Sequence, residues 1–247
     1  MNMMISNIIF AQLKPVSYLD DKIKLNGFAI SPKKSLNDNP GILILPAWRG
    51  INKLAKDTAV KLSAMGYVAF IADIYGEGNY PKDNAEAGEI AGYYKKNYGE
   101  YQRRIMIAID QLVQNGANPT KIVVIGYCFG GTGAIEAARG QLPVVGVVSF
   151  HGGLGKEANR ITENMTAKIL VCHGADDPYV PQEEILNFQN EMRNAKADWQ
   201  MIYYPNAVHS FTNPESGNDN SKGAAYNQSA AERSWEHFKI FLKEILN

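Results

Sequence analysis

The chain has 247 residues, of which 45% are hydrophobic and 20% are charged, as is usual for a globular protein. The 25 basic and 25 acidic residues give a formal net charge of +0, and no basic stripe is present, so nucleic acid is not expected as a partner. Two cysteines exclude a disulfide-dense scaffold. No apolar run reaches transmembrane length, so no membrane partner is expected either.

The N-terminal segment, residues 1–13, allows more than one interpretation. Met3 to Ala11 is mostly apolar and ends in Phe-Ala-Gln, which resembles the tail of a secretory signal, but no Lys or Arg precedes it. The segment is therefore interpreted as a remnant of a signal or as a first strand. A signal would place the protein in the periplasm or outside the cell. Without a signal, the cytoplasm is expected.

Strands and helices alternate along the rest of the chain. Strands are predicted at Val16–Leu19 and Gly27–Ile30, which form an opening hairpin, and at Ile42–Leu45, Tyr67–Ala72, Ile122–Ile125, Val144–Phe150, Lys168–Cys172 and Gln200–Tyr204. Helices are predicted at Asn52–Met65, Ala85–Lys95, Tyr101–Gln114, Phe129–Arg139, Pro181–Ala195 and Ala224–Leu246. This alternation predicts an α/β fold in one domain, residues 1–247, with a mostly parallel sheet and helices on both faces.

The segment Gly126-x-Cys128-x-Gly130 has the spacing of a nucleophile elbow, with Cys where Ser usually stands. At a sharp strand-to-helix turn the residues two before and two after the nucleophile come very close together, so glycine is favoured at both. The following helix directs its N-terminus at the sulfur, which favours the thiolate. The alternative for Cys128 is a buried structural Cys between two packing glycines. Cys172, in its apolar strand, is interpreted as a small apolar core residue.

A Cys nucleophile needs a base, and an acid that orients the base. His209 follows the last predicted strand, so it lies at the carboxyl edge of the sheet, where functional groups collect in such folds. His151 and His173 also follow buried strands, whereas His237 is expected to face solvent from the last helix. His209 is therefore the predicted base, and the alternative for it is a loop histidine that caps the last helix.

The predicted acid is Asp177, which follows the strand Lys168–Cys172. The adjacent Asp176 is expected to bond the backbone of its own turn, although both residues suit a turn. The chain order of nucleophile, acid and base is the order found in α/β-hydrolases. For the oxyanion hole we expect the backbone N–H of Phe129 and a second donor from the loop after Leu45, with Trp48 preferred and Ala47 next.

The chain resembles the dienelactone hydrolase family at four segments. They are Gly126-Tyr-Cys-Phe-Gly-Gly, Asp73-Ile-Tyr-Gly, His173-Gly-Ala-Asp-Asp-Pro-Tyr-Val-Pro and Ala207-Val-His-Ser-Phe. The resemblance covers roughly residues 41–246. It implies an α/β-hydrolase fold and hydrolysis of an ester or lactone through an acyl-enzyme, with Cys128, His209 and Asp177 as the triad. No cofactor or metal is expected.

Two departures from the family pattern put the substrate in doubt. Family members that act on dienelactones have a Glu in the loop where this chain has Ala47, and an Arg for the substrate carboxylate where Glu77 lies in this chain. A neutral ester or lactone is therefore the expected small-molecule partner. The residues expected to contact it come from segments near the elbow, namely Arg49, Tyr75, Tyr127, His151 and Phe211.

Other functions remain open at this point. A thioesterase, or a binding protein on a hydrolase scaffold that has lost its chemistry, would keep the same fold. Glutamine amide transfer is disfavoured because Thr132 stands where that class has Gln and no His-x-Glu pair occurs. No His-x-His or His-Glu-x-x-His motif indicates a metal. The assembly is expected to be a monomer or a small homo-oligomer.

Overall fold

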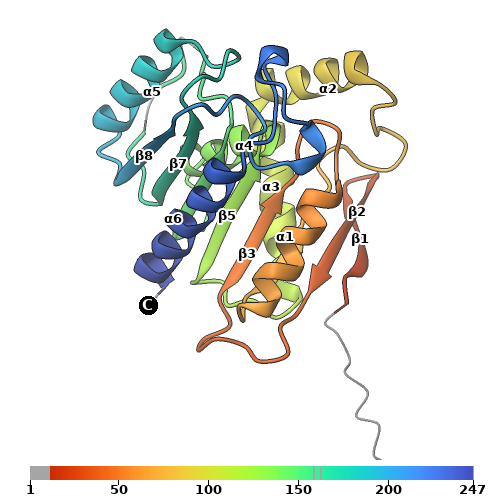
Figure 1. The fold of residues 1–247 in the computed structure, drawn as a ribbon. Coiled ribbons are helices and arrows are strands. Elements are labelled where there is room, and N and C mark those ends of the chain that lie inside the picture. The colour runs from red at the N-terminus through yellow and green to blue at the C-terminus, as the bar shows by residue number, and fades with distance from the viewer. Residues whose placement is uncertain (1–11, 158, 162, 247) are drawn as a thin grey trace, which may run out of the picture.

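A computed structural model describes residues 12–157, 159–161 and 163–246. The apolar segment Met3 to Ala11, interpreted above as a signal remnant or a first strand, lies outside the described residues. Residues 12 and 13 precede the first strand. The chain then builds one eight-stranded sheet, in the order β1-β2-β4-β3-β5-β6-β7-β8, so the predicted α/β-hydrolase fold class is confirmed (Figure 1).

The eight strands differ in direction in the way the sequence predicts. β1 and β2 form an antiparallel hairpin, β2 pairs antiparallel with β4, and the other neighbours are all parallel. The strands are β1 Lys14–Asp20, β2 Ile23–Ile30, β3 Gly41–Leu45, β4 Val68–Ile71, β5 Ile122–Tyr127, β6 Gly146–Phe150, β7 Lys168–Gly174 and β8 Trp199–Tyr204. Every residue of β3, β4, β5 and β6 is buried, as expected for strands covered on both faces.

Helices cover both faces of this sheet (Figure 1). One face is covered by α1 (Lys53–Ala64) and α6 (Gln228–Leu246), whose apolar residues share a core with the strands. The other face is covered by α3 (Tyr98–Gln114), α4 (Phe129–Arg139) and α5 (Gln182–Asn194). Helix α2 (Asn84–Lys96) packs on α3 and lies at the end of the sheet where the parallel strands end, which is the end that carries the elbow (Figure 1).

The last helix begins later than the sequence predicts, and the difference affects the site. α6 starts at Gln228 instead of Ala224, because the Asn227 side chain accepts the N–H of Ala230 and so provides the N-terminal cap. Ala224 instead forms a parallel bridge with His209, and the N–H of Ala225 donates to the His209 carbonyl at 3.0 Å. The segment before α6 therefore holds the backbone of the predicted base.

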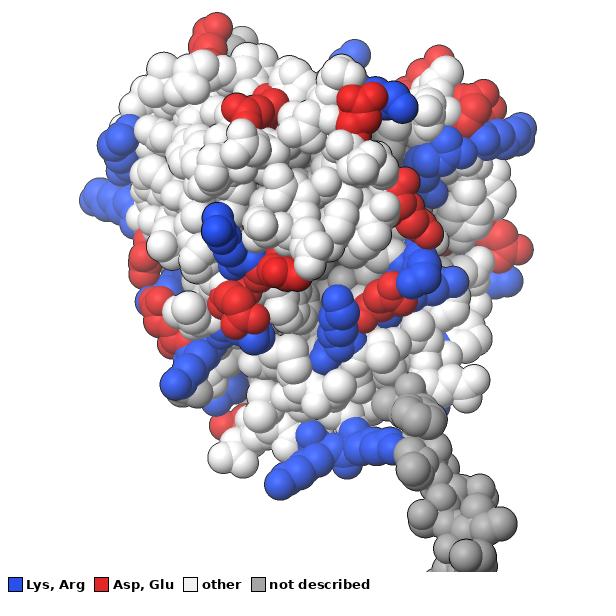
Figure 2. Space-filling view, viewed as in Figure 1, with Lys and Arg blue, Asp and Glu red and all other residues white. Residues whose placement is uncertain are grey.

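The surface carries charges of both signs. On the face seen in Figure 2, basic and acidic side chains are interspersed, as the balanced composition leads one to expect. Among the described residues, no helix is both long enough and apolar enough to cross a membrane.

Candidate active site

The turn after β5 has the geometry of a nucleophile elbow. Cys128 has φ 55° and ψ −115°, an unfavourable conformation for a residue with a side chain. A Cβ on Gly126 would lie 1.9 Å from the carbonyl oxygen of Gly130, and one on Gly130 would lie 2.1 Å from that of Leu45. Both glycines are therefore required by close backbone approach, as the spacing predicts.

The structure places Cys128, Asp177 and His209 at one edge of the sheet, each after the end of a different parallel strand. His209 Nδ1 lies 2.8 Å from Asp177 Oδ2, and the Asp177 side chain is fully buried. Asp177 Oδ1 accepts the backbone N–H of Tyr179 at 2.9 Å, so the carboxylate is held at both oxygens. On its other side His209 is hydrogen-bonded to the Cys128 side chain. The three predicted residues thus form one continuous chain of contacts.

Asp176 does not have the role expected for it. Its side chain is exposed, and its backbone N–H donates to the Ala207 carbonyl at 3.0 Å. Asp177 itself makes the turn hydrogen bond, to Tyr179, that was expected of Asp176. Asp176 is exposed whereas the Asp177 side chain is buried, so only the second carboxylate bonds within the turn.

The electrostatic environment of Cys128 and His209 favours transfer of the thiol proton to the imidazole. Burial opposes ionisation of Cys128, but the hydrogen bond and charge of His209, the N–H of Phe129 and the charge of Lys95 lower the pKa of the thiol below its usual value. Burial also opposes protonation of His209, yet its hydrogen bonds to Asp177 and Cys128 raise the pKa of the imidazole. The site therefore favours a thiolate–imidazolium pair.

A pocket of about 420 Å³ opens at Cys128 and His209. Its walls are mostly apolar or uncharged, and no carboxylate lines it. The lining residues are Trp48, Gly88, Ala91, Gly92, Lys95, Cys128, Phe129, Gly153, Tyr179, Val180, His209, Ser210 and Ala224. Nine of them, Lys95, Tyr179 and Val180 included, were not predicted as site residues. Lys95 brings to the pocket a cation whose charge acts on Cys128.

The two predicted oxyanion donors both belong to the pocket wall. The Phe129 N–H is hydrogen-bonded to the Cys128 sulfur, as expected for the first residue of a helix that begins at the nucleophile. Trp48 also lines the pocket, and its carbonyl accepts the Tyr75 hydroxyl at 2.7 Å. Asp73 in turn accepts the N–H groups of Tyr75 and Gly76, so the Asp-Ile-Tyr-Gly segment is a turn that supports the Trp48 loop.

Most of the predicted substrate contacts lie elsewhere, and these expectations are corrected. The Arg49 guanidinium is exposed and donates to Asn84 Oδ1 at 2.6 Å and to the Lys82 carbonyl at 3.1 Å, away from the pocket. Tyr127 points to the other face of the sheet, where its hydroxyl meets Thr58 at 3.1 Å. Phe211 is fully buried, and Tyr75 supports the Trp48 loop from below.

Two of the other histidines and the second cysteine can also be placed. His151 is buried beneath the elbow, and its Nδ1 accepts the backbone N–H of Cys128 at 3.2 Å, so it does not line the pocket. His237 was expected in solvent, but it is half-buried against Tyr204, whose hydroxyl lies 2.9 Å from its Nδ1. Cys172 is fully buried in β7, where the sequence predicts a core residue.

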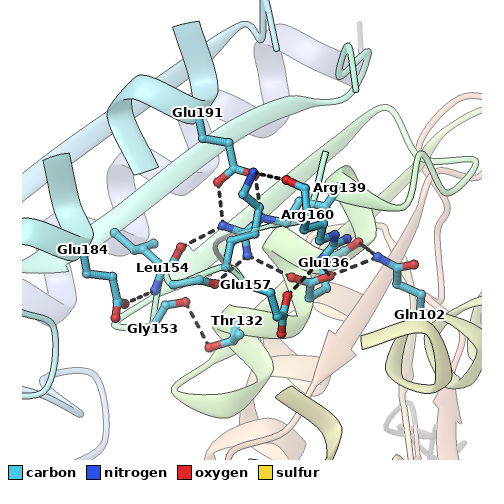
Figure 3. A network of polar contacts seen from close by, with 12 residues as sticks. Gln102, Thr132, Glu136, Arg139, Gly153, Leu154, Glu157, Arg160, Glu184 and Glu191 are labelled. Carbon is cyan, nitrogen blue, oxygen red and sulfur yellow. Dashed lines mark hydrogen bonds and ion pairs between the residues drawn. The ribbon is translucent and has the colours of Figure 1, made fainter. Parts of the chain in front are cut away.

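A buried ionic network fixes the loop after β6, which contributes Gly153 to the lining of the pocket (Figure 3). Arg139 donates to Glu191 at 3.0 and 2.7 Å, to Glu136 at 2.8 Å, and to the carbonyls of Leu154 and Gly155 at 2.8 Å each. These five bonds use all the guanidinium donors. Figure 3 also shows Glu184 and Thr132 bonded to the backbone of this loop, at the N–H of Leu154 and the carbonyl of Gly153.

Within the described residues, no group of three or more His, Cys, Asp or Glu side chains could hold a metal ion.

Comparison of the sequence with models of known protein families identifies the family. The dienelactone hydrolase family model matches residues 25–246. The chain belongs to the dienelactone hydrolase family. The family is one of carboxylic ester and lactone hydrolases, so the enzyme class expected from the sequence is confirmed.

Three relatives of this dienelactone hydrolase family member illustrate the match. A dienelactone hydrolase-like promiscuous phosphotriesterase from metagenomic libraries is 34% identical, with a TM-score of 0.89 over 96% of this chain and 99% of its own. A structure named m3DLH is 30% identical, with a TM-score of 0.90 over 96% and 100%. A Bradyrhizobium protein described as a probable 2-oxo-3-(5-oxofuran-2-ylidene)propanoate lactonase is 29% identical over 83% of each chain.

Proposed function

We propose that the protein hydrolyses esters or lactones through a Cys128–His209–Asp177 triad and an acyl-enzyme. The observation that carries the proposal is the continuous contact from Asp177 Oδ2 through His209 to the Cys128 thiol, at the mouth of a 420 Å³ pocket. A binding protein that had lost its chemistry would have no need of a strained Cys128 with a lowered thiol pKa.

The reaction runs in two balanced halves. The Cys128 thiolate attacks the carbonyl carbon, and the carbonyl electron pair moves to oxygen, which receives hydrogen bonds from the N–H of Phe129 and a second N–H, expected from Trp48. The tetrahedral intermediate collapses to a thioester, and the leaving alkoxide takes the proton of the His209 imidazolium. His209 then removes a proton from water, which attacks the thioester and releases the acid and the thiol of Cys128.

The pocket supports a substrate with an apolar part and a negatively charged part. Trp48, Ala91 and Val180 offer apolar walls, which suits the neutral, partly apolar group expected from the sequence. Lys95 adds a cation on the α2 side, so we extend the substrate class to esters and lactones that carry a carboxylate. The Bradyrhizobium relative is described as acting on such an anionic lactone. A thioester would enter the same mechanism, because only the leaving group changes.

The acyl-enzyme is the species that tests this function. A slow p-nitrophenyl ester should give a burst of p-nitrophenol equal to the enzyme concentration, and the intact protein mass should rise by one acyl group on Cys128. Cys128→Ala should show neither burst nor mass change and should keep its fold by circular dichroism. A protein that binds the ester without a burst, or a Cys128→Ala variant with full activity, would show that the triad assignment is wrong.

A second candidate function is hydrolysis of phosphotriesters by the same site. The observation that favours it is 34% identity over 96% of the chain with a protein described as a promiscuous phosphotriesterase. Attack of Cys128 on phosphorus would displace the aryloxide and leave a phosphoryl thioester that water must cleave. With a p-nitrophenyl phosphotriester, p-nitrophenol released beyond one equivalent per enzyme would establish turnover, whereas release that stops at one equivalent would show inactivation.

A further inference from the structure

The residue directly after β6, His151, lies beneath the nucleophile in an unusual conformation. Its φ is 42°, in the left-handed region that a residue with a side chain rarely adopts, and it is 1% exposed. Its backbone N–H donates to the Cys172 carbonyl at 2.9 Å, which fixes the main chain to β7. A buried polar ring held in such a backbone requires compensating contacts.

Both ring nitrogens of His151 make contacts, and the contacts define its tautomer. Nδ1 accepts the backbone N–H of Cys128 at 3.2 Å, and that N–H also donates to the Phe150 carbonyl at 3.0 Å. Because Nδ1 is an acceptor, the proton of the neutral ring is on Nε2, which donates to Thr212 Oγ1 at 2.8 Å. Thr212 lies three residues after His209 in the same loop. One imidazole therefore joins the nucleophile's backbone to the loop of the base.

The His151 ring also packs directly on the ring of the base. The centroids of His151 and His209 are 5.3 Å apart at 65°, and Tyr179 packs on His209 at the same distance and 88°. The titratable groups near His151 are Cys128, His209, His173 and Tyr127. Burial, together with the charges of His209 and His173, holds the pKa of His151 well below its usual value, which agrees with the neutral tautomer.

We propose that His151 is a positioning residue of this site: as a neutral Nε2–H tautomer it links the Cys128 N–H to Thr212 and so sets the separation of the thiol and the His209 imidazole. The proposal rests on the proposed function for its effect on turnover. It does not rest on that function for its effect on Cys128 itself, because the contacts of His151 with the Cys128 N–H and with the His209 ring exist without substrate. A misplacement of about 1 Å at a reacting pair costs roughly a hundredfold in rate.

The test compares His151→Phe, which keeps the ring and removes both hydrogen bonds, with His151→Gln, which keeps one acceptor and one donor. For His151→Phe we expect kcat to fall roughly 10- to 100-fold with KM little changed. The thiolate titration of Cys128, followed by ultraviolet absorbance with no substrate present, should move to higher pH. His151→Gln should recover part of both effects. Thr212→Val removes only the outer bond and should give a smaller change in the same direction.

The possible results distinguish a positioning role of His151 from a purely structural role in the fold. If His151→Phe lowers Tm but leaves kcat and the thiol titration at wild-type values, the proposal is wrong. If that variant does not fold, Thr212→Val against Thr212→Ser decides, and an unchanged thiol titration in Thr212→Val overturns the proposal. If the wild type hydrolyses no ester while the titration moves in the variants, the proposed function fails and the positioning role of His151 stands.

Discussion

The two cysteines of this chain have opposite ionisation properties. Contacts with His209 lower the pKa of the Cys128 thiol, whereas burial in β7 raises the pKa of Cys172 to about 12. We therefore expect iodoacetamide to label Cys128 across neutral pH and Cys172 only in strong alkali or after unfolding. Peptide mapping after alkylation at several pH values measures both sites. Preferential labelling of Cys172 in the folded protein would contradict the assignment.

The paired aspartates Asp176 and Asp177 offer a matched comparison at one turn. Asp177→Asn leaves the shape of the side chain but allows the wrong imidazole tautomer of His209, so kcat should fall by several powers of ten. Asp176→Asn changes an exposed side chain and should leave kcat and Tm close to wild type. Steady-state kinetics and melting curves of both variants test this. Equal losses of activity in the two variants would remove Asp177 from its proposed role.

Lys95 and Lys96 are neighbours on α2, but only Lys95 lines the pocket that holds Cys128. Reversal of charge in Lys95→Glu should lower kcat/KM for a carboxylated aryl ester at least about tenfold relative to its neutral methyl ester, equivalent to about 1.4 kcal/mol. Lys96→Glu is the control and should leave the ratio of the two substrates nearly unchanged. If both variants keep the wild-type ratio of kcat/KM for the two substrates, Lys95 does not bind a carboxylate and neutral esters remain the expected substrates.

At the scale of elements, the ionic network of Figure 3 joins α4, α5 and the loop after β6. Arg139→Met would leave the buried carboxylates of Glu136 and Glu191 without this cation and would release two loop carbonyls. Loss of one partner of a buried pair costs about 3–5 kcal/mol, so we expect a loss of that size in the free energy of unfolding. Urea denaturation measures it.

A surface pair provides the control for the Arg139 experiment. Lys53 and Asp57 form an exposed i,i+4 pair on α1, and Asp57→Asn should change stability by less than about 1 kcal/mol. Similar losses in Arg139→Met and Asp57→Asn would contradict the structural importance of the network. A stable Arg139→Met variant that loses activity would instead show that the network serves mainly to hold Gly153 in the lining of the pocket.

The elements that could be predicted from the sequence are those whose structure is determined by a pattern in their own residues. Buried runs and helical periodicity located β3, β5, α1 and α4, and glycine spacing located the elbow. Cys128, Asp177 and His209 come together because the carboxyl ends of parallel strands share one edge. The late start of α6 was missed because the segment before it pairs with the loop of His209, a contact that does not appear in local periodicity.

Side-chain directions at the site depended on packing between distant elements. Arg49 was expected to reach the substrate, but Asn84 at the start of α2 binds its guanidinium. The place of Lys95 in the pocket is not predicted from the sequence, because it follows from how α2 lies across the end of the sheet. His151 was correctly placed near the elbow, yet it lies beneath the nucleophile. The sequence thus predicts which strand ends meet, but not which face each side chain presents.

The whole molecule should lose stability in mild acid, because two histidines are buried in forms that resist protonation. Burial lowers the pKa of both His151 and His173 in the folded state. In the unfolded chain both have pKa values of about 6.5. Below that pH the unfolded state binds more protons, so the free energy of unfolding falls by up to about 1.4 kcal/mol per pH unit for each group. His209 acts in the opposite direction near pH 6.5, because its raised pKa keeps it protonated in the native state while the unfolded imidazole still gains protons as the pH falls.

Urea unfolding at pH 6.5 and 5.5 measures this slope in a range above the titration of ordinary carboxyl groups, whose pKa values are about 4. We expect the two groups together to lower the free energy of unfolding by up to about 2 kcal/mol over that unit, because an imidazole with an unfolded-state pKa of about 6.5 is already half protonated at pH 6.5. His173→Phe removes one of them, together with a buried Nδ1 that has no hydrogen-bond partner among the described residues, and should halve the slope. Equal stability of the wild type at the two pH values would mean that both histidines are protonated in the native state, which is incompatible with His151 as an acceptor for the Cys128 N–H.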